Sequence, residues 1–457
     1  MWCLILVFLR VTLLFSFFPL ISSSTSEMDP HELETLFKIM ETLSADQNWR
    51  ESHPNPCKPG SSWNGIECKT TGNDGFIHVS RLDFGIPPNP SCKETAIFPA
   101  EIFLLPHLES VFFFQCFTNT KTVISFPEAN QLLVNSSLQQ LSIRSNPALV
   151  GLIPSQISSL KSLEILTLSQ NKFHGPIPAQ IFSLKSLLHL DFSYNMITGK
   201  IPFQVGNLGK LVGLDLSYNS LTGAIPNTIG QLGMLQKLDL SSNQLTGSIP
   251  IALFNLQSMV FIALSSNKIR GFFPVGLSKL QNLQYFIMDD NPMFTLLPSE
   301  FGDLEKLQEL RLANSGYFGT IPSSYSKLSN LSTLSLQNNR LRGEIPVSFG
   351  NLSRIYHLNL SRNFLDGVVP FNSSFLSRLG KNLDLSGNPG LCLSPNDAHG
   401  FNLGVNICKS SKKSGLPWQK SEAHHHHHHQ PHGLTSFFVT IIITLISVAW
   451  AHLFLHI

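Results

Sequence analysis

Charged residues are scarce in this sequence, and their scarcity narrows the range of possible functions. Asp, Glu, Lys and Arg make up 13% of the 457 residues, well below the ~25% that is usual for soluble domains. The formal net charge is only +2. The composition therefore does not point to nucleic acid or to a strongly acidic molecule as a partner.

Catalytic and cofactor motifs are also missing. The sequence contains no G-x-S-x-G nucleophile elbow, no H-E-x-x-H zinc motif and no glycine-rich phosphate loop. A kinase would need a separate domain with its own catalytic loop, and the repeats described below leave no room for one. We therefore expect no catalytic residues, no cofactor and no metal site, and we interpret the chain as a binding protein rather than an enzyme.

Cysteine is absent from the long central stretch 117–391. Apart from Cys3, the cysteines form sequence-local pairs on either side of that stretch, namely Cys57 with Cys68, Cys92 with Cys116, and Cys392 with Cys408. Six cysteines allow fifteen pairings, and we favour the local ones because they flank the cysteine-free centre. Zinc binding is the alternative, but the spacings lack the short steps of structural zinc sites.

A repeat of 24 residues fills the centre of the chain. Proline recurs at every 24th residue from Pro154 to Pro370. One clean copy begins at Leu235 and reads LQKLDLSSNQLTGSIP. Such a period is the signature of a solenoid, in which each coil becomes stable only by stacking on its neighbours.

Each position in the clean copy has a physical role. Leu238 and Leu240 alternate with Asp239, which predicts a short strand with the leucines pointing inward. Asn243 can bond backbone groups through its amide, so its repetition predicts a ladder. Gly247 allows a backbone angle that other residues resist. The motif resembles the plant class of leucine-rich repeat, and we predict an α/β solenoid: a leucine-rich-repeat superhelix of about eleven coils over residues 99–391.

Both ends of the solenoid look like caps, at 25–98 and 392–408. Asp29 and Pro30 predict a helix start, with Glu32 as the acid of a capping box. The following residues give one apolar helical face, formed by Leu33, Leu36, Ile39, Met40 and Leu43. We expect the local disulfides to close these two caps.

The two chain ends predict export and membrane attachment. Residues 1–24 have an apolar run followed by small residues, which is typical of a signal peptide; an uncleaved membrane anchor is the alternative. A polar linker at 409–433 precedes an apolar tail at 434–457 that has no Lys or Arg after it. This pattern favours a GPI-attachment signal over a retained transmembrane helix. We place lipid attachment at Ser421, with Ser414–Gly415 as an alternative, and interpret the histidines at 424–429 as spacer or linker rather than a metal site.

Two further sets of residues are candidate sites. Sequons for N-glycosylation, which agree with secretion, occur at Asn135, Asn330, Asn351, Asn359 and Asn372. Solenoids usually bind partners on the concave sheet, through side chains that vary between coils. Most coils carry uniform Asp and Ser there, but three coils differ, and their residues are our candidate partner-binding patch: Phe261, Tyr285, Ile287, Asp289, Glu309 and Arg311. Drift in a tolerant repeat is the alternative explanation.

Three segments carry a closer resemblance: Val111–Thr118, Ser137–Pro147 and Pro370–Asn388. They resemble the small branch of plant leucine-rich-repeat receptor-like proteins that contains TOO MANY MOUTHS. The resemblance implies a kinase-free co-receptor at the extracellular face of the plasma membrane, which pairs with receptor kinases and modulates responses to secreted peptides. The alternative is a cell-wall inhibitor resembling polygalacturonase-inhibiting proteins, a class that needs no apolar tail.

Overall fold

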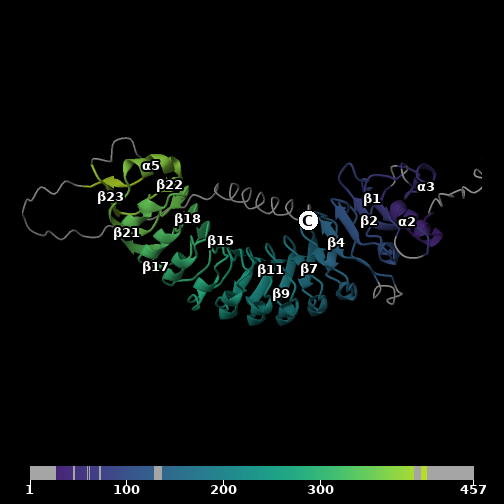
Figure 1. The fold of residues 1–457 in the computed structure, drawn as a ribbon, viewed down its shortest axis with the longest axis horizontal. Coiled ribbons are helices and arrows are strands. Elements are labelled where there is room, and N and C mark those ends of the chain that lie inside the picture. The colour runs from purple at the N-terminus through teal and green to yellow at the C-terminus, as the bar shows by residue number, and fades with distance from the viewer. Residues whose placement is uncertain are drawn as a thin grey trace, which may run out of the picture. The chain divides into compact units, whose positions relative to one another are not determined.

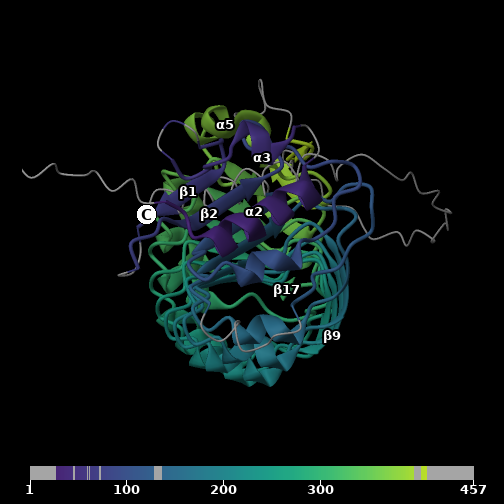
Figure 2. The ribbon, with the colours of Figure 1, turned by 90° about the vertical axis from the view of Figure 1, so that its right-hand side faces the viewer.

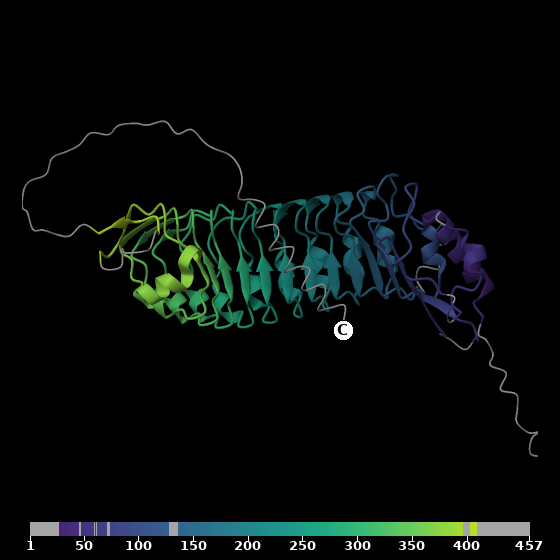
Figure 3. The same cartoon turned by 90° about the horizontal axis from the view of Figure 1, so that it is seen from above.

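The 24-residue repeats fold into stacked coils, as the sequence predicts. Each coil contributes one short strand to a 14-stranded sheet that lines the concave side (Figures 1 and 3). Apart from the first two strands, which are antiparallel, the strands pair in parallel, and Leu238 lies between Leu214 and Ile262 of the neighbouring coils. Leu238 and Leu240 are fully buried, which confirms the predicted alternation.

The structure is a computed structural model that describes residues 27–44, 47–58, 60, 62–70, 74–127, 136–395 and 403–408. The described residues belong to one compact unit that ends at Cys408. The predicted signal peptide, polar linker, apolar tail, Asn135 and Ser421 lie outside the described residues. Within the described part, no helix is both long enough and apolar enough to cross a membrane.

The concave sheet follows chain order from the N-terminal cap to the last coil. Its strands are β1 (Ile66–Lys69), β2 (His78–Phe84), β3 (Ser110–Phe114), β4 (Gln140–Arg144), β6 (Ile165–Thr167), β8 (His189–Asp191), β10 (Gly213–Asp215), β12 (Lys237–Asp239), β14 (Phe261–Ala263), β15 (Tyr285–Ile287), β16 (Glu309–Arg311), β18 (Thr333–Ser335), β20 (His357–Asn359) and β22 (Leu383–Asp384).

A second set of strands lies beyond the turn of each coil and forms two separate five-stranded sheets. The first contains β5 (Val150–Leu152), β7 (Lys172–Pro176), β9 (Met196–Lys200), β11 (Ser220–Ala224) and β13 (Gln244–Thr246). The second contains β17 (Phe318–Gly319), β19 (Arg340–Gly343), β21 (Phe364–Val368), β23 (Gly390–Leu393) and β24 (Asn406–Ile407). These lateral sheets are interrupted between β13 and β17.

Short 3₁₀ helices form the convex side. Most of them start directly after the recurring proline, which fixes the backbone angle at the entry to the turn. Their bounds are η1 (Ala100–Leu104), η2 (Ser155–Ser159), η3 (Ala179–Ser183), η4 (Phe203–Asn207), η5 (Asn227–Gln231), η6 (Ile251–Asn255), η7 (Leu277–Lys279), η8 (Ser299–Asp303), η9 (Ser323–Lys327), η10 (Val347–Asn351) and η11 (Gly380–Asn382).

The recurring asparagine forms the predicted ladder. Asn243 Oδ1 accepts the backbone N–H of Leu221 in the preceding coil at 2.9 Å. Its Nδ2 donates to the carbonyl oxygens of Leu216 at 2.9 Å and Leu240 at 3.2 Å. One buried side chain thus satisfies backbone groups of two coils that would otherwise be buried without a partner. Gly247 has a φ of 80°, in agreement with the role predicted for it.

Helix α2 (Pro30–Leu43) and helix α3 (Trp49–Ser52) cover the first coil together with the antiparallel β1–β2 pair (Figure 2). Asp29 caps α2, because its carboxylate accepts the backbone N–H groups of His31 and Glu32. The capping-box role predicted for Glu32 is not what the structure shows. Glu32 is buried, and its carboxylate turns to strand β2, where it accepts the N–H of Val79 at 2.8 Å.

At the other end, helix α5 (Ser373–Leu379) closes the stack beside the last strands. Asn372 caps this helix through a hydrogen bond from the N–H of Phe375 at 2.9 Å. The disulfides join the partners that the sequence predicts: Cys57 with Cys68, Cys92 with Cys116, and Cys392 with Cys408. The solenoid and its caps are therefore confirmed.

Candidate binding surface on the concave sheet

The parallel register arranges the outward side chains of neighbouring coils in rows. Phe261, Tyr285 and Glu309 occupy one row. Ile287 and Arg311 are paired in the next row. Asp289 lies two residues after the end of β15. The fold thus brings the six predicted partner-binding residues together on three adjacent coils, and we call these residues the central patch.

Aromatic rings form one half of the central patch. The rings of Phe261 and Tyr285 lie 6.0 Å apart between centroids, at an angle of 44°. Tyr285 Oη donates a hydrogen bond to Gln308 Oε1 at 3.2 Å. On the other side, Lys237 Nζ lies 5.9 Å from the centroid of the Phe261 ring, within the range of a cation–π contact. Both rings remain partly exposed, so their faces are accessible to a partner.

An ion pair forms the other half of the central patch. Arg311 Nε donates to Asp289 Oδ2 at 2.8 Å, and Arg311 Nη1 lies 3.7 Å from Glu309 Oε1. Asp289 Oδ1 also accepts the backbone N–H of Ala313 at 2.7 Å. Burial raises the pKa of both Asp289 and Glu309, although the nearby Arg311 guanidinium opposes the increase. The guanidinium is therefore held in place from two sides.

Two of the predicted contact residues are buried. Ile287 is 7% exposed and Asp289 is 4% exposed, so a partner would reach little of either side chain. Asp289 lies beneath Arg311, which pairs with it. The expectation that these two residues are accessible to a partner is therefore wrong. The accessible part of the central patch is Phe261, Tyr285, Glu309 and Arg311.

A row of three aspartates adjoins the central patch. The sequence analysis did not single it out, because Asp recurs at this position in several coils. Asp191, Asp215 and Asp239 are stacked in register on three neighbouring coils. Each accepts hydrogen bonds from the backbone N–H and the hydroxyl of the serine two residues later. Lys237 Nζ lies 3.0 Å from Asp215 Oδ2. Lys237 thus joins the acidic row to the aromatic half of the central patch.

The same region contains the break in the lateral sheets, and exposed apolar side chains lie at its edge. Phe294, Leu296 and Phe318 are all exposed, and Leu296 pairs with Phe318 through an isolated bridge. Arg340 lies over the Phe294 ring at 5.4 Å. In the sequence, this region is marked by Thr295, which stands where most other coils have the recurring glycine. The exposure of the Phe294 and Phe318 rings could be found only from the structure.

Four of the predicted glycosylation positions lie in the described part: Asn330, Asn351, Asn359 and Asn372. Asn372 is exposed, and only its Oδ1 is used in capping α5, which leaves Nδ2 for attachment. Asn330 Nδ2 donates to the carbonyl oxygen of Glu305 at 2.7 Å, and a glycan there would have to share or replace that contact. Glycosylation at these positions remains a prediction.

Comparison with known proteins agrees with the repeat and the solenoid. The family model described as Leucine rich repeat matches residues 202–245, and a second one, Leucine Rich Repeat, matches 162–184, 186–208 and 330–352. Receptor like protein 29 of Arabidopsis thaliana is 68% identical over 148 residues, which cover 32% of this chain and 31% of that protein. The chain thus aligns to less than a third of the length of this relative.

Solved structures show the same fold. The PEPR1–AtPEP1 crystal structure matches with a TM-score of 0.62 at 27% identity, covering 80% of this chain and 49% of that one. The plant peptide hormone receptor RGFR1 in complex with RGF2 matches with a TM-score of 0.51 at 25% identity, covering 73% and 71%. Together with the 24-residue motif and the capped solenoid, these similarities support the interpretation of the chain as a plant leucine-rich-repeat receptor-like protein.

Proposed function

We propose that this protein is a kinase-free co-receptor or modulator of receptor-kinase signalling, and that it binds a protein or peptide rather than catalysing a reaction. The central patch is the observation that carries this proposal. Over three adjacent coils, Asp and Ser give way to two aromatic rings and an oriented arginine, which are the residue types that anchor interfaces.

The chemistry of the central patch suits an extended peptide or a protein loop. The faces of Phe261 and Tyr285 would cover apolar side chains of the partner. Arg311 would offer its remaining N–H groups to a carboxylate or a carbonyl oxygen, since Asp289 already holds its Nε in place. RGFR1 is a plant peptide hormone receptor and was solved in complex with RGF2. By analogy, we infer secreted peptides or receptor kinases as partners.

The proposed location is the extracellular face of the plasma membrane. A GPI anchor at Ser421 would hold the solenoid there, and N-glycans would cover the C-terminal coils at Asn330, Asn351, Asn359 and Asn372. The disulfide-closed caps support this location, because such bonds persist in oxidising compartments.

The test is a pull-down from plant membranes with the full-length protein as bait. We choose Phe261→Ala/Tyr285→Ala as the test variant, because both rings are accessible. Removing Arg311 would instead leave Asp289 as an unpaired buried charge and would mix a stability effect with a binding effect. The double variant should lose the receptor kinase or peptide that the wild type captures.

The matched control is Tyr194→Ala/Tyr218→Ala, which removes another aromatic pair from the same unit. These rings are stacked 4.1 Å apart and lie outside the central patch. The control should capture the same partners as the wild type. Equal capture by the wild type and by Phe261→Ala/Tyr285→Ala, with both proteins folded, would refute the central patch as the binding surface.

A further inference from the structure

A cluster of metal-ligating side chains that the sequence did not predict lies where the N-terminal cap meets the first coil. Asp74, His78 and His107 each offer one ligand atom, and these atoms all lie within 4.8 Å of one another. His78 begins strand β2, and His107 lies shortly before β3. In the parallel pairing of these strands Arg81 lies opposite Ser110, and the same spacing places His107 opposite His78. The parallel register of the first coil therefore brings the two imidazoles together, with ring centroids 3.9 Å apart.

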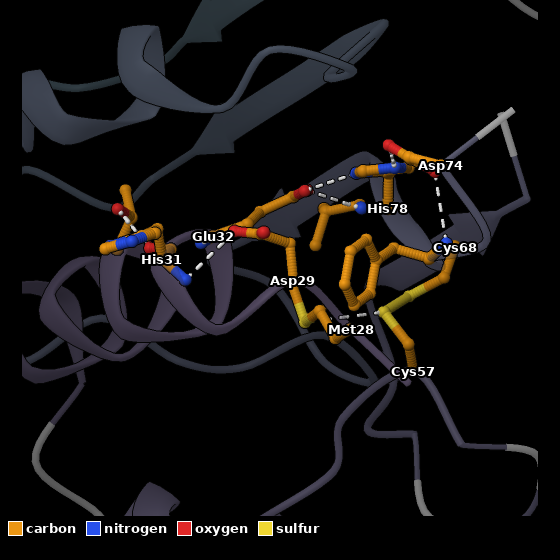
Figure 4. A network of polar contacts seen from close by, with 11 residues as sticks. Met28, Asp29, His31, Glu32, Cys57, Cys68, Asp74 and His78 are labelled. Atoms are coloured by element: carbon orange, nitrogen blue, oxygen red, sulfur yellow. Dashed lines mark hydrogen bonds and ion pairs between the residues drawn. A yellow bond between two sulfur atoms is a disulfide. The ribbon is translucent and has the colours of Figure 1, made fainter. Parts of the chain in front are cut away.

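His78 is held in the orientation that a metal ligand requires. Its Nδ1 lies 2.6 Å from Glu32 Oε2, and both residues are buried, at 3% and 4% exposure (Figure 4). The other oxygen of Glu32 is fixed by the N–H of Val79. When a buried carboxylate accepts the proton on one ring nitrogen of a histidine, the second ring nitrogen keeps its lone pair. Histidines that bind metals are commonly oriented by a carboxylate in this way.

The free nitrogen of His78 faces the remaining members of the cluster. His78 Nε2 lies 3.1 Å from Asp74 Oδ2, close to the roughly 3.3–3.5 Å that separates neighbouring ligand atoms around a tetrahedral zinc ion with bonds of about 2.0–2.2 Å. Without a metal, a proton on His78 Nε2 could be donated to Asp74 as a hydrogen bond. It would leave His107 stacked on His78 without a hydrogen-bond partner among the described residues.

We propose that Asp74, His78 and His107 bind one divalent transition-metal ion of the Zn²⁺ type, with Glu32 orienting His78 and the fourth position open to water or a ligand. Two imidazoles and a carboxylate are typical zinc ligands. The carboxylates of Glu32 and Asp74 balance the two charges of the ion. The site ties the residues before β2, helix α2 and the entry to β3 together, so the bound ion strengthens the contact between the cap and the first coil.

Zinc binding to the full-length protein tests this proposal. In every sample the histidines at 424–429 are replaced by serine, because a histidine run binds zinc by itself. Metal is removed with a chelator, and Zn²⁺ is then titrated by calorimetry while Co²⁺ binding is followed by its visible absorption. The test variants are His107→Gln and Asp74→Asn, which leave the buried contact between Glu32 and His78 intact. The control is His31→Gln, because His31 is an exposed histidine on helix α2.

We expect one Zn²⁺ per chain in the protein with native Asp74, His78 and His107 and in His31→Gln. Affinity should fall by roughly tenfold or more in each test variant. Zinc should also raise the melting temperature of the first two proteins but not that of His107→Gln. An unchanged melting temperature in chelator shows that each variant is folded. No zinc binding in the protein with the native cluster, or equal affinity in His107→Gln, overturns the proposal.

Discussion

Replacing Asp239 with asparagine should stabilise the protein in neutral and alkaline solution but have little effect in acid. Asp239 is only 7% exposed and lies beside Asp215 in the acidic row. Burial, together with the charge of Asp215, raises the pKa of Asp239 from 3.8 to about 7. An asparagine has nearly the same shape, and its Oδ1 can accept the same hydrogen bonds from the N–H and hydroxyl of Ser241.

The sign and size of the effect follow from this pKa. A carboxyl whose pKa is raised on folding contributes its full stability below the unfolded pKa of 3.8, and that contribution is lost as the pH rises through about 7. The difference of about 3 units corresponds to about 4 kcal/mol at 1.36 kcal/mol per unit. Most of this penalty, about 3–4 kcal/mol, develops between pH 4 and pH 8. Asp239→Asn should remove it.

Urea unfolding of the full-length wild type and Asp239→Asn at pH 4, 6 and 8, followed by circular dichroism, measures the effect. The gain in the free energy of unfolding should grow with pH. Asp384→Asn is the matched control for the change of Asp to Asn, because Asp384 stands in the same row of the last coil and the paired residue beside it is the neutral Asn359. At pH 8, Asp239→Asn should show the larger gain. A gain for Asp239→Asn that is flat with pH, or a loss at pH 8, would refute the reasoning.

Two further predictions concern the ion pair of the central patch and the anchor. Arg311→Ala should lower the free energy of unfolding by about 3 kcal/mol, because it leaves the buried Asp289 carboxylate without its cation. Asp289→Asn/Arg311→Met should recover most of that loss in the same urea assay, and a wild-type midpoint for Arg311→Ala would contradict this account. A phosphatidylinositol-specific phospholipase should release the protein from plant cell surfaces, since we propose a GPI anchor at Ser421; protein that stays entirely with the membrane would show that the anchor is of another kind.

Periodicity made most of the fold predictable. A residue that recurs every 24 positions has the same neighbours in each coil, so the inward role of Leu238, the ladder role of Asn243 and the turn at Gly247 could be inferred from one copy. The disulfides were predictable for a related reason. Each pair joins two residues at the same end of the solenoid that are at most 24 positions apart in sequence, and there a short separation in sequence also means a short separation in space.

The parts that could not be predicted depend on contacts between particular side chains of different coils. The pattern shows that Asp289 follows a strand, but not that Arg311 of the next coil covers it. It identifies Glu32 as a residue near a helix start, but the hydrogen bond to Val79 spans 47 residues. His78 and His107 come together across the first, irregular coil, where the 24-residue spacing does not apply.

The break between the lateral sheets has a mechanical consequence. On either side of it, neighbouring coils are joined twice, by the concave sheet and by a lateral sheet. No backbone hydrogen bond joins residues 268–275 to residues 292–297, although the structure describes both segments in full. Bending stiffness depends on how many hydrogen-bonded ladders cross a junction, so we expect this junction to bend more easily than the doubly joined junctions on either side of it. This junction adjoins the central patch. A partner that binds the central patch could therefore change the curvature of the concave sheet there.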